Sequence, residues 1–484
     1  MKLRDLLNGI EIVETNADME MEIEAVAYDS RKVTPKSLFV AISGFASDGN
    51  RFIPMAMEKG ACVVVTAKKP EVEVPYVLVP GDRLALALIG TNFYGHPAKS
   101  MTMIGVTGTN GKTSTTLLLK QVLEKTIGAK VGLIGTMENL VGDEVIPTER
   151  TTPESLELQA LFARMRDAGC THVVMEVSSH ALTLERVGGV HFNVASFTNL
   201  TEDHLDFHKT MDEYCAAKAM LFERCDKAVI NTDDFYSFHM VEKAPHHETL
   251  TTSLTGNGDL NGAYPEYHAE GVTFEVVEGL DERYEVKLPI PGKFTVYNAL
   301  TVLGIAQSLG VTLERSAAAL AKAKGVKGRI EVVPTPGKPF SVLIDYAHTP
   351  DGLENVLSSV KDFCKGRVIS VFGCGGDRDP IKRPIMGEIG VKLADFAIIT
   401  SDNPRTEDPL AIIDDILKGV DPSMGPYVVV PERRTAIRYA MDIAKKDDII
   451  VLAGKGHETY QEINGVKYHL DEREEVAAHL AEMG

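Results

Sequence analysis

The sequence predicts an α/β protein built from three domains. A chain of 484 residues is long enough for two to four domains at roughly 100–200 residues each. Apolar runs of strand length alternate with helical patterns, which is typical of parallel sheets. The sequence shows no internal repeat or low-complexity tract. We expect a small N-terminal α/β domain at 1–98, a central parallel sheet at 99–329 and a doubly wound parallel sheet at 330–484.

Composition narrows the class of protein. The formal net charge is −19 and the pI is near 5.2, which argues against nucleic acid as the main partner because no basic face can neutralise phosphates. The six cysteines form no CxxC pair, so we expect buried thiols in a reducing compartment. No secretory leader and no stretch of about 20 apolar residues is present, so we expect a cytoplasmic protein without membrane insertion.

The first two domains show their strands as apolar runs. In the first domain a strand at 38–42 and a strand at 61–67 flank the loop 43–50 and a helical stretch. The central domain has four such runs, at 101–108, 130–136, 171–179 and 227–233. The segment 250–292 has an antiparallel, insert-like pattern instead.

The sequence of the third domain predicts a ligand-binding crevice. Its five strands are expected at 341–346, 367–373, 395–401, 427–431 and 448–454. A polar loop follows each of them, and these loops read YAHTPD, GCGGDRD, SDNPR, PERR and GKGHE. Loops at the carboxyl ends of parallel strands emerge on one edge of a sheet, which is where ligands bind. We therefore expect these five loops to line one site.

The stretch 105–115, GVTGTNGKTST, predicts a phosphate-binding loop. It follows a strand and opens a helix, so its backbone N–H groups can cradle phosphates. The strict spacing would place glycine where Val106 stands, so the loop is a variant. The alternative is a glycine-rich turn with an incidental lysine. The expected nucleotide-binding residues here are Gly108, Thr109, Asn110, Gly111, Lys112, Thr113 and Ser114.

Lys218 occupies an unexpected position. Thr210 and Glu213 form a capping box that predicts a helix from about residue 211. Lys218 then falls in the middle of its apolar stripe, between Tyr214 and Phe222. A buried lysine is costly unless it is paired or loses its charge. The alternative is a packed stem whose ammonium reaches water.

Two further features suggest a divalent metal near the phosphate loop. Upstream of Lys218, His204, Asp206 and His208 alternate along the chain. Glu176 ends an otherwise apolar strand, where an unpaired carboxylate is expensive. A metal or a bound cation would explain Glu176, and a buried salt bridge is the alternative.

Taken together, the motifs resemble those of the Mur ligase family. The matching segments run in order through the whole chain and read GVTGTNGKTST, EVSSHAL, FTNLTEDHLDFH, AAKAMLF, GRIEVV, DYAHTPD, FGCGGDRD and AGKGHE. The resemblance implies a P-loop-type central sheet and a Rossmann-like C-terminal sheet. It also implies ATP- and Mg²⁺-dependent amide bond formation on the terminal carboxylate of UDP-N-acetylmuramoyl-L-alanyl-D-glutamate.

The resemblance also implies individual roles. The matching lysine of the family is carbamylated, so Lys218 is expected as N6-carboxylysine. His204 and carbamylated Lys218 would then serve one Mg²⁺, and Thr113 and Glu176 the other. Lys112, Lys218, His204 and Glu176 are the expected catalytic residues. The expected nucleotide contacts outside the phosphate loop are Asn298, Arg329, Asp345 and His348. The expected contacts to the nucleotide sugar are Ser30, Thr151, Thr152, Ser178 and Arg186.

Structural alternatives exist for several of these residues. Asn298 could be an ordinary helix amide, Ser30 and Ser178 could be turn residues, and Asp345 could cap the helix that starts near Pro350. Arg150 stands where related enzymes often carry Asn, and the loop 45–47 differs from some relatives. The contacts to the nucleotide sugar are therefore less firmly assigned than the phosphate loop.

The loop 401–405, SDNPR, is the expected selector of the incoming amino acid. In the resembling family this tetrapeptide, DNPR, marks members that add meso-2,6-diaminopimelate. A guanidinium fork suits the second carboxylate that distinguishes this substrate from lysine. The alternative is an Arg405 that merely pairs with Glu407 or Asp402. The expected site comprises Arg378, Asp402, Asn403, Pro404, Arg405, Gly454 and Glu458.

Other functions remain open at this point. An L-lysine-adding ligase of the same family is the nearest alternative. Folylpolyglutamate synthase shares the phosphate loop, but the N-terminal segment with YDSR and the RTTPES stretch argue against it. A non-catalytic, ATP-dependent sensor of cell-wall precursors belongs to a different class. Retention of Lys112, Glu176, His204 and Lys218 together argues against that sensor.

Overall fold

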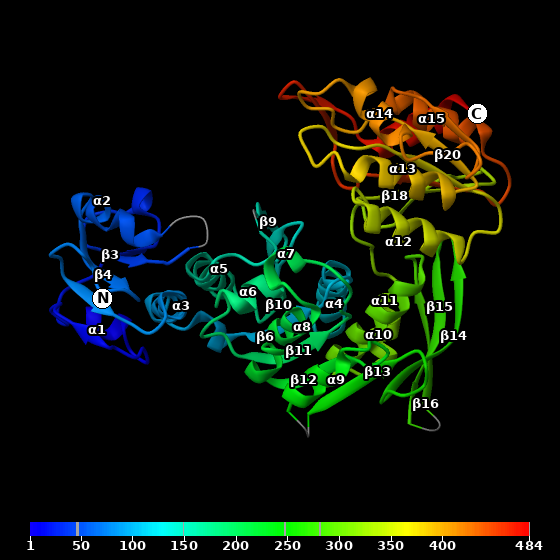
Figure 1. The fold of residues 1–484 in the computed structure, drawn as a ribbon. Coiled ribbons are helices and arrows are strands. Elements are labelled where there is room, and N and C mark those ends of the chain that lie inside the picture. The colour runs from blue at the N-terminus through cyan, green and yellow to red at the C-terminus, as the bar shows by residue number, and fades with distance from the viewer. Residues whose placement is uncertain (45–47, 149, 246–247, 280–281, 484) are drawn as a thin grey trace. The chain divides into compact units, whose positions relative to one another are not determined.

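The computed structural model describes residues 1–44, 48–148, 150–245, 248–279 and 282–483, apart from the side chain of Asp206 (Figure 1). The three residues 45–47 of the loop singled out above therefore lie outside the description. The chain forms two compact units, one of Met1–Asn261 with Leu300–Ser316 and one of Gly262–Ala299 with Ala317–Gly484.

The first unit begins with a small five-stranded sheet. Its order is β1 (Glu14–Thr15), β5 (Tyr76–Leu78), β4 (Ala61–Thr66), β3 (Ser37–Ala41) and β2 (Ala25–Ala27). Neighbouring strands of this sheet pair in parallel, except β1 and β5, which pair antiparallel. The helices are α1 (Leu3–Leu6), α2 (Ile53–Glu58) and α3 (Asp82–Phe93). The two predicted strands at 38–42 and 61–67 are confirmed as β3 and β4.

The large sheet of this unit carries the phosphate loop at its centre. In spatial order its strands are β13 (Thr249–Ser253), β12 (Cys225–Asn231), β11 (Phe192–Phe197), β6 (Thr102–Thr107), β10 (His172–Glu176), β7 (Val131–Ile134), β8 (Asn139–Val141) and β9 (Glu144–Ile146). The pairs from β13 to β7 are parallel, and β8 and β9 extend the edge antiparallel. The four predicted central strands are confirmed as β6, β7, β10 and β12. Strands β8, β9, β11 and β13 were not predicted.

Helices pack around this large sheet (Figure 1). They are α4 (Lys112–Ile127), α5 (Ser155–Asp167), α6 (Ser179–Thr183), α7 (Leu205–His208), α8 (Met211–Ala219) and α9 (Ser237–Lys243). A single core joins α5 and α8 to the strands, with Phe162, Val173, Phe197 and Leu221 fully buried. Because β6 lies between β11 and β10, the loop after β6 has strand ends on both sides.

The expected antiparallel segment at 250–292 is partly confirmed. Strands β15 (Gly271–Glu278) and β16 (Glu282–Leu288) form an antiparallel hairpin in the second unit. The preceding strand β14 (Leu260–His268) instead begins parallel to β13. Helices α10 (Lys293–Ser308) and α11 (Leu313–Leu320) follow the hairpin.

The second unit contains the doubly wound sheet that the sequence predicts. Its order is β17 (Glu331–Val333), β18 (Ser341–Asp345), β22 (Ile449–Ala453), β19 (Val368–Phe372), β20 (Phe396–Ile399) and β21 (Tyr427–Val429). All five predicted strands are confirmed and pair in parallel, and β17 adds an unpredicted antiparallel edge. Strands β23 (Tyr460–Ile463) and β24 (Val466–His469) form a separate hairpin.

Helices cover both faces of this third sheet. Residues of α12 (Pro350–Lys361), α13 (Lys382–Lys392) and α14 (Pro409–Leu417) share one core with the strands. Residues of α15 (Arg433–Ile443) and α16 (Glu472–Glu482) share a second core. Two separate cores are what a parallel sheet with helices on both sides requires, because each face of the sheet must be buried.

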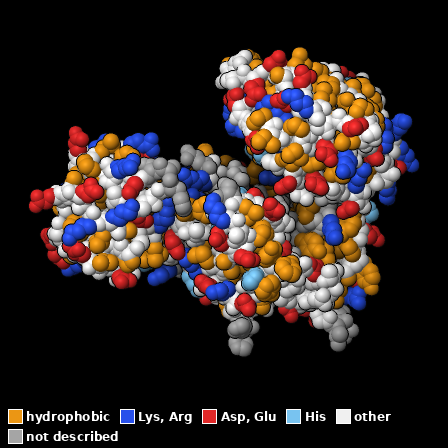
Figure 2. All heavy atoms as spheres, in the orientation of Figure 1, with side chains coloured by type: hydrophobic (Ala, Val, Ile, Leu, Met, Phe, Trp, Pro, Cys, Tyr) orange, Lys and Arg blue, Asp and Glu red, His pale blue; other side chains and the backbone are white. Residues whose placement is uncertain are grey.

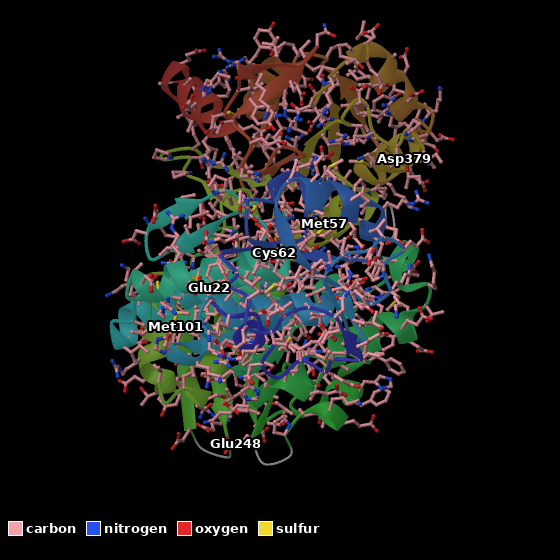
Figure 3. All side chains as sticks on the ribbon, turned by 90° about the vertical axis from the view of Figure 1, so that its left-hand side faces the viewer. Glu22, Met57, Cys62, Met101, Glu248 and Asp379 are labelled. Atoms are coloured by element: carbon pink, nitrogen blue, oxygen red, sulfur yellow. The ribbon has the colours of Figure 1, made fainter. Side chains whose placement is uncertain are left out.

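The surface and the cysteines agree with the composition. Acidic and basic side chains are interspersed over the visible face in Figure 2, without a continuous basic patch there. All six cysteines are free; Cys62 (labelled in Figure 3) and Cys364 are half-buried and the other four are buried. Across the described parts of the chain, no helix is both long enough and apolar enough to span a membrane.

Candidate active site

The loop between β6 and α4 has the form that phosphate binding requires. Gly108 and Gly111 have φ angles of 151° and 86°, in the region that favours glycine, and α4 begins directly after them at Lys112. A Cβ on Gly108 would collide with the Thr198 hydroxyl. The Lys112 Nζ donates to the carbonyls of Gly108 and Thr109, both at 2.8 Å. The strand–loop–helix context of the motif is therefore present.

The segment after β11 supports this loop, which the sequence did not reveal. Asn199 accepts the Thr109 N–H at its carbonyl (2.8 Å) and the Asn110 N–H at its side-chain oxygen (2.9 Å). The Thr198 hydroxyl donates to the Asn110 carbonyl at 2.7 Å. The mainly apolar stretch 192–197, FNVASF, was the available signal, since it has strand length and precedes the mostly polar TNLTED.

Lys218 is buried at the phosphate loop. Its side chain lies on α8, where Thr210 caps the helix by accepting the Glu213 N–H at 3.2 Å, as predicted. Lys218 is 1% exposed, and its Nζ donates to the Gly108 carbonyl at 2.7 Å and lies 4.6 Å from the centre of the Tyr214 ring. The alternative in which its ammonium reaches water is therefore wrong. Burial, followed by the charge of Lys112, lowers the pKa of Lys218 well below its usual value.

His204 lies beside the same tyrosine. It precedes α7 with a φ of 55°, and its ring centre is 6.1 Å from that of Tyr214 and 4.9 Å from that of His180. Its Nε2 is 3.4 Å from the Asp203 carboxylate, and the side chain is half-exposed. The structure thus brings His204, Lys218 and the phosphate loop into one neighbourhood through Tyr214. The Asp206 side chain of the sequence motif lies outside the description.

Glu176 ends β10 with its carboxylate covered. The side chain is 1% exposed, and its two oxygens accept the backbone N–H and the hydroxyl of Thr136, both at 3.0 Å. Among the ion pairs of the described chain none involves Glu176, so the structure offers no buried salt bridge for it. Sequence reasoning missed Thr136, which follows β7 and therefore lies beside the end of β10.

Several residues predicted for the nucleotide sugar gather around Glu176. The Thr152 hydroxyl donates to the Glu176 carbonyl (2.8 Å) and accepts the Ser178 N–H (3.2 Å). Arg186 donates to the Thr152 carbonyl at 3.2 Å, and the hydroxyls of Thr151 and Thr136 lie 3.0 Å apart. Arg186 is anchored by Glu154, whose carboxylate is 2.9 Å away.

Both serines occupy local structural positions. Ser178 is the N-cap of α6 and accepts the Ala181 N–H at 3.2 Å, which is the turn-type role considered as an alternative. Ser30 lies in the 3₁₀ turn Ser30–Lys32 of the first sheet's domain, 6% exposed, with its hydroxyl 3.4 Å from the Met55 sulfur. These positions leave their contacts to a substrate as predictions.

In the second unit, Asp345 organises the loop after β18. Its carboxylate accepts the N–H groups of Ile330 and Ala347, both at 2.8 Å, and burial raises its pKa. Helix α12 is capped by Thr349, which accepts the Gly352 N–H at 3.2 Å. The alternative in which Asp345 caps this helix is therefore wrong.

The other predicted nucleotide residues of this unit lie as follows. The Arg329 guanidinium is 5.4 Å from the centre of the Tyr346 ring, a cation–π contact. The His348 Nδ1 is 2.9 Å from the Tyr346 carbonyl oxygen. Asn298 is buried in α10 at 4% exposure. Tyr346 therefore connects Arg329 and His348 beside Asp345.

The SDNPR loop follows β20 and is held by ion pairing that the sequence did not predict. The Arg405 Nε is 3.2 Å from the Glu462 carboxylate, and its Nη1 donates to the Gly376 carbonyl at 2.8 Å. Glu407 instead pairs with Arg383 at 2.8 Å. The alternative in which Arg405 pairs with Glu407 or Asp402 is therefore wrong.

The β23–β24 hairpin fixes this loop through its backbone. The backbone carbonyl of Glu462 accepts the Arg405 N–H at 3.0 Å, and the Glu462 N–H donates to the Asn403 side-chain oxygen at 2.9 Å. The Gln461 amide donates to the Asp402 carbonyl at 2.6 Å. Sequence reasoning missed this hairpin, whose turn Asn464-Gly465 was a recognisable signal.

The loops after β22 and β19 meet the SDNPR loop. Asn403 donates its amide to Glu458 at 2.9 Å, and a Cβ on Gly454 would collide with the Asp402 carboxylate. Arg378 lies on an exposed loop, with its Nη1 donating to the Asp377 carbonyl at 3.1 Å. The structure thus gathers Asp402, Asn403 and Glu458, all of which were predicted.

Two buried cationic side chains of this region were not predicted from the sequence. Lys455 is fully buried, with its Nζ 3.0 Å from Asn403 Oδ1 and 3.1 Å from the Glu458 carboxylate. Arg433 and Glu472 form a fully buried ion pair at 2.7 Å, and Arg433 also donates to the Ala453 carbonyl at 2.9 Å. The lysine of the AGKGHE motif directly follows a predicted buried strand, so its burial could have been considered in the same way as that of Lys218.

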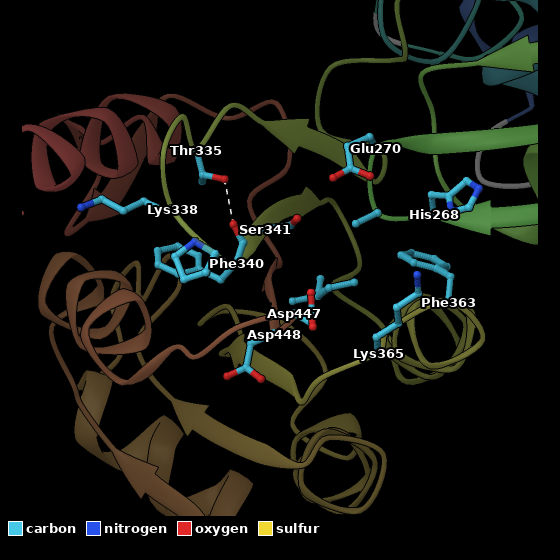
Figure 4. Close-up of a pocket in the computed structure, with 13 residues that line it drawn as sticks. His268, Glu270, Thr335, Lys338, Phe340, Ser341, Phe363, Lys365, Asp447 and Asp448 are labelled. Atoms are coloured by element: carbon cyan, nitrogen blue, oxygen red, sulfur yellow. Dashed lines mark hydrogen bonds between the residues drawn. The ribbon is translucent and has the colours of Figure 1, made fainter.

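A cavity of about 330 Å³ in the second unit does not coincide with these residues (Figure 4). Its lining includes Ser341 and Ile449, the first residues of β18 and β22. It therefore lies at the amino-terminal edge of the sheet, away from the five polar loops. None of the predicted site residues lines it. The chemistry of the loops therefore identifies the candidate site better than the shape of this cavity does.

Comparisons with known proteins agree with the motifs. Three family models match the chain: the Mur ligase family catalytic domain at residues 22–98, the Mur ligase middle domain at 106–306 and the Mur ligase glutamate ligase domain at 328–456. The chain belongs to the Mur ligase family, and its fold is the three-domain α/β architecture of that family.

Its relatives carry a more specific name. UDP-N-acetylmuramoyl-L-alanyl-D-glutamate--2,6-diaminopimelate ligase of Clostridium tetani is 47% identical over 100% of both chains. The ligase of the same name from Caldanaerobacter subterraneus subsp. tengcongensis is 49% identical over 100% of this chain and 99% of its own. A solved structure under that name matches with a TM-score of 0.77 and 32% identity, over 100% of this chain and 99% of the other.

Proposed function

We propose that this protein is an ADP-forming ligase that adds meso-2,6-diaminopimelate to UDP-N-acetylmuramoyl-L-alanyl-D-glutamate in peptidoglycan synthesis. The observation that carries the proposal is the SDNPR loop, which holds Arg405 and Asn403 at the carboxyl edge of the third sheet beside Glu458. Relatives named for this reaction match the chain over its whole length. We propose the cytoplasm as the place of the reaction, because ATP is the phosphate donor.

The proposed reaction has two steps. An oxygen of the precursor's terminal carboxylate attacks the γ-phosphorus of ATP, the bond to the bridging oxygen breaks, and ADP leaves with that electron pair. The amino nitrogen of diaminopimelate then attacks the carbonyl carbon of the acyl phosphate, inorganic phosphate leaves, and the nitrogen loses a proton. Phosphorylation is needed because a free carboxylate is a poor acylating agent. Two anions must approach in the first step, so cationic groups are required.

The phosphate loop supplies such groups. The backbone N–H groups of residues 111–114, at the start of α4, bind phosphate oxygens, and Lys112, which touches the carbonyls of the same loop, neutralises their charge. Asn298, Arg329, Asp345 and His348 are proposed as further nucleotide contacts. Thr151, Thr152, Ser178 and Arg186, with Ser30, are proposed to bind the nucleotide sugar.

The lowered pKa of Lys218 supports its proposed carbamylation. Only a neutral amine can attack CO₂, and burial favours the neutral form. The product would be N6-carboxylysine, whose carbamate carries a negative charge in place of a lysine's positive one. This change would convert a cation beside the phosphate loop into a ligand for a metal.

The residues present fit Mg²⁺ in the form that phosphoryl-transfer enzymes use. The described part of the chain contains no cluster of three or more His, Cys, Asp or Glu side chains suited to a metal. Mg²⁺ commonly uses one or two carboxylates and completes its shell with water and phosphate oxygens. Thr113 and Glu176 would hold one Mg²⁺, and His204 and carbamylated Lys218 would hold the other. When bound, Mg²⁺ would neutralise charge on the phosphates.

The amino-acid site is proposed in the second unit. Arg405 would bind the distal carboxylate of diaminopimelate, which lysine lacks, and Glu458 would face the distal ammonium. Asp402, Asn403, Pro404, Arg378 and Gly454 would complete the site. The domain boundaries at 98/99 and 329/330 are proposed as the limits of the sugar-binding, ATP-binding and amino-acid-binding domains.

The test is release of ADP and phosphate from purified protein with ATP, Mg²⁺ and the UDP-linked dipeptide precursor. Meso-diaminopimelate, L-lysine and L-ornithine are compared as acceptors. We expect release that requires both precursor and diaminopimelate. Preference for lysine would make the protein the lysine-adding ligase instead, and no acceptor-dependent release with any of the three would contradict the ligase assignment.

A further inference from the structure

Lys455 is buried where the loops of the third sheet meet. Its side chain is fully covered, and its Nζ lies 3.0 Å from Asn403 Oδ1, 3.1 Å from Glu458 Oε2 and 3.9 Å from Asp402 Oδ1. Two of the three ammonium hydrogens are therefore bonded to Asn403 and Glu458, and Asp402 lies at ion-pair distance. A side chain that is fully covered in this way does not touch a substrate itself. Any influence on the reaction must pass through its neighbours.

We propose that Lys455 is a positioning residue of the amino-acid site, which fixes the Asn403 amide and the Glu458 carboxylate in the orientation that receives the incoming amino acid. This inference rests on the function proposed above. It joins two loops, because Asn403 follows β20 and Glu458 follows β22.

The contacts of Asn403 determine which end of its amide faces the site. Oδ1 accepts from both the Lys455 Nζ at 3.0 Å and the Glu462 N–H at 2.9 Å, which uses both of its lone pairs. Nδ2 donates one hydrogen to Glu458 at 2.9 Å. The second Nδ2 hydrogen is the one hydrogen-bonding group of the Asn403 side chain that these contacts among the described residues do not use. Asn403 therefore offers a donor, which suits a carboxylate of the incoming amino acid rather than its ammonium.

The charges around Lys455 suit the other end of an amino acid. Asp402 and Glu458 bring two carboxylates to one ammonium, while the nearby Arg433 is matched by Glu472 at 2.7 Å. The cluster thus keeps one net negative charge when all five groups are ionised. That charge complements an ammonium group. Without Lys455 the two carboxylates would repel each other, and Asn403 Oδ1 would lose its charged donor.

The test compares K455M with the matched control K467M. Both lysines lie over the Tyr460 ring, at 5.6 and 4.0 Å, but Lys467 is exposed. We expect K455M to raise KM for diaminopimelate about 100-fold and to leave KM for ATP and for the UDP-linked precursor within about twofold, because the defect is confined to one subsite. K467M should behave as wild type. Equal losses for all three substrates, or no loss, would overturn the proposal.

A double-mutant cycle separates positioning from general support. If Lys455 acts through Asn403, the K455M change should raise KM for diaminopimelate far less in an N403A background than in the wild type. Independent, multiplicative effects of the two substitutions would contradict a role through Asn403.

If K455M does not fold, the N403D variant provides a second test of the amide orientation. This variant keeps an oxygen for Lys455 and Glu462 and replaces Nδ2 by a second oxygen. A site that needs a donor should lose about 100-fold in KM for diaminopimelate, whereas unchanged or improved affinity would show that the amide orientation is wrong. A wild-type protein without diaminopimelate-dependent phosphate release contradicts the proposed function. An active wild type with an unaffected K455M contradicts only the role of Lys455.

Discussion

Lys218 and Lys455 are equally buried but are held in opposite ways. Lys218 donates to a neutral carbonyl, that of Gly108, and lies within electrostatic reach of the cation Lys112. Lys455 lies between an amide oxygen and the carboxylates of Glu458 and Asp402. One lysine is on the helix beside the phosphate loop, and the other is on a loop of the third sheet.

The difference shows how burial can produce either a reactive or a structural lysine. A buried amine beside a neutral carbonyl and a second cation loses its proton easily, which is the state that reacts with CO₂. A buried ammonium between carboxylates forms an ion pair, and its removal leaves negative charges uncompensated.

K218A should reduce kcat by roughly 1,000-fold or more, because the variant lacks the anionic carbamate proposed to bind Mg²⁺ for phosphoryl transfer. Phosphate release with saturating ATP, precursor and diaminopimelate measures it. Added bicarbonate should not restore the variant, since no amine remains to react. In the wild type, ¹³C-labelled bicarbonate should produce a carbamate NMR signal that K218A lacks. Full activity of K218A would refute a reactive Lys218.

R405K should raise KM for diaminopimelate about 100-fold, because an ammonium cannot replace the guanidinium fork on a carboxylate. The control is R438K, which alters an exposed arginine paired with Glu482 in the same domain. Initial rates at varied diaminopimelate give the two constants. An R405K enzyme with an unchanged KM would remove Arg405 from the amino-acid site.

The two lysines should have opposite effects on stability. The folded-state pKa of Lys218 lies below its unfolded value, so between the two values the unfolded chain binds more protons and the free energy of unfolding rises with pH. K218M should remove this rise and stabilise the protein at neutral pH by about 1 kcal/mol, whereas K455M should destabilise it by about 3 kcal/mol.

Urea unfolding of both variants between about pH 6 and about pH 9 measures the two effects, with the wild type in CO₂-depleted buffer so that Lys218 stays unmodified. A K218M protein that is less stable than the wild type at neutral pH would show that the buried amine contributes to folding. Shifts of the same sign in both variants would remove the contrast between the lysines.

The smallest effects concern two capping threonines. Thr210 caps α8, which carries Lys218, and Thr349 caps α12, and each accepts a backbone N–H at 3.2 Å. T210A and T349A should each lower the free energy of unfolding by about 1 kcal/mol. T210A should also reduce kcat severalfold, because the helix that positions Lys218 is loosened at its start. Equal activity of the two variants would show that this cap does not matter for the site.

The sequence by itself determined the features that depend on local pattern. Apolar runs and the loops after them predicted all five parallel strands of the third sheet, since strand-length hydrophobicity is a local property. The capping box placed α8 correctly, and the helical period placed Lys218 in its buried stripe. The phosphate loop was recognisable because its glycines, lysine and helix start are consecutive.

Only the tertiary structure decided which distant groups meet. The sequence could not show that Thr136 would bind Glu176, that Glu462 rather than Glu407 would pair with Arg405, or that the β23–β24 hairpin would hold the SDNPR loop. These contacts join residues from 40 to 59 positions apart, so no local periodicity encodes them. The fold also decides which charges lie beside each buried lysine. The sign of those charges determines whether the lysine is reactive, as proposed for Lys218, or holds neighbouring side chains in place, as proposed for Lys455.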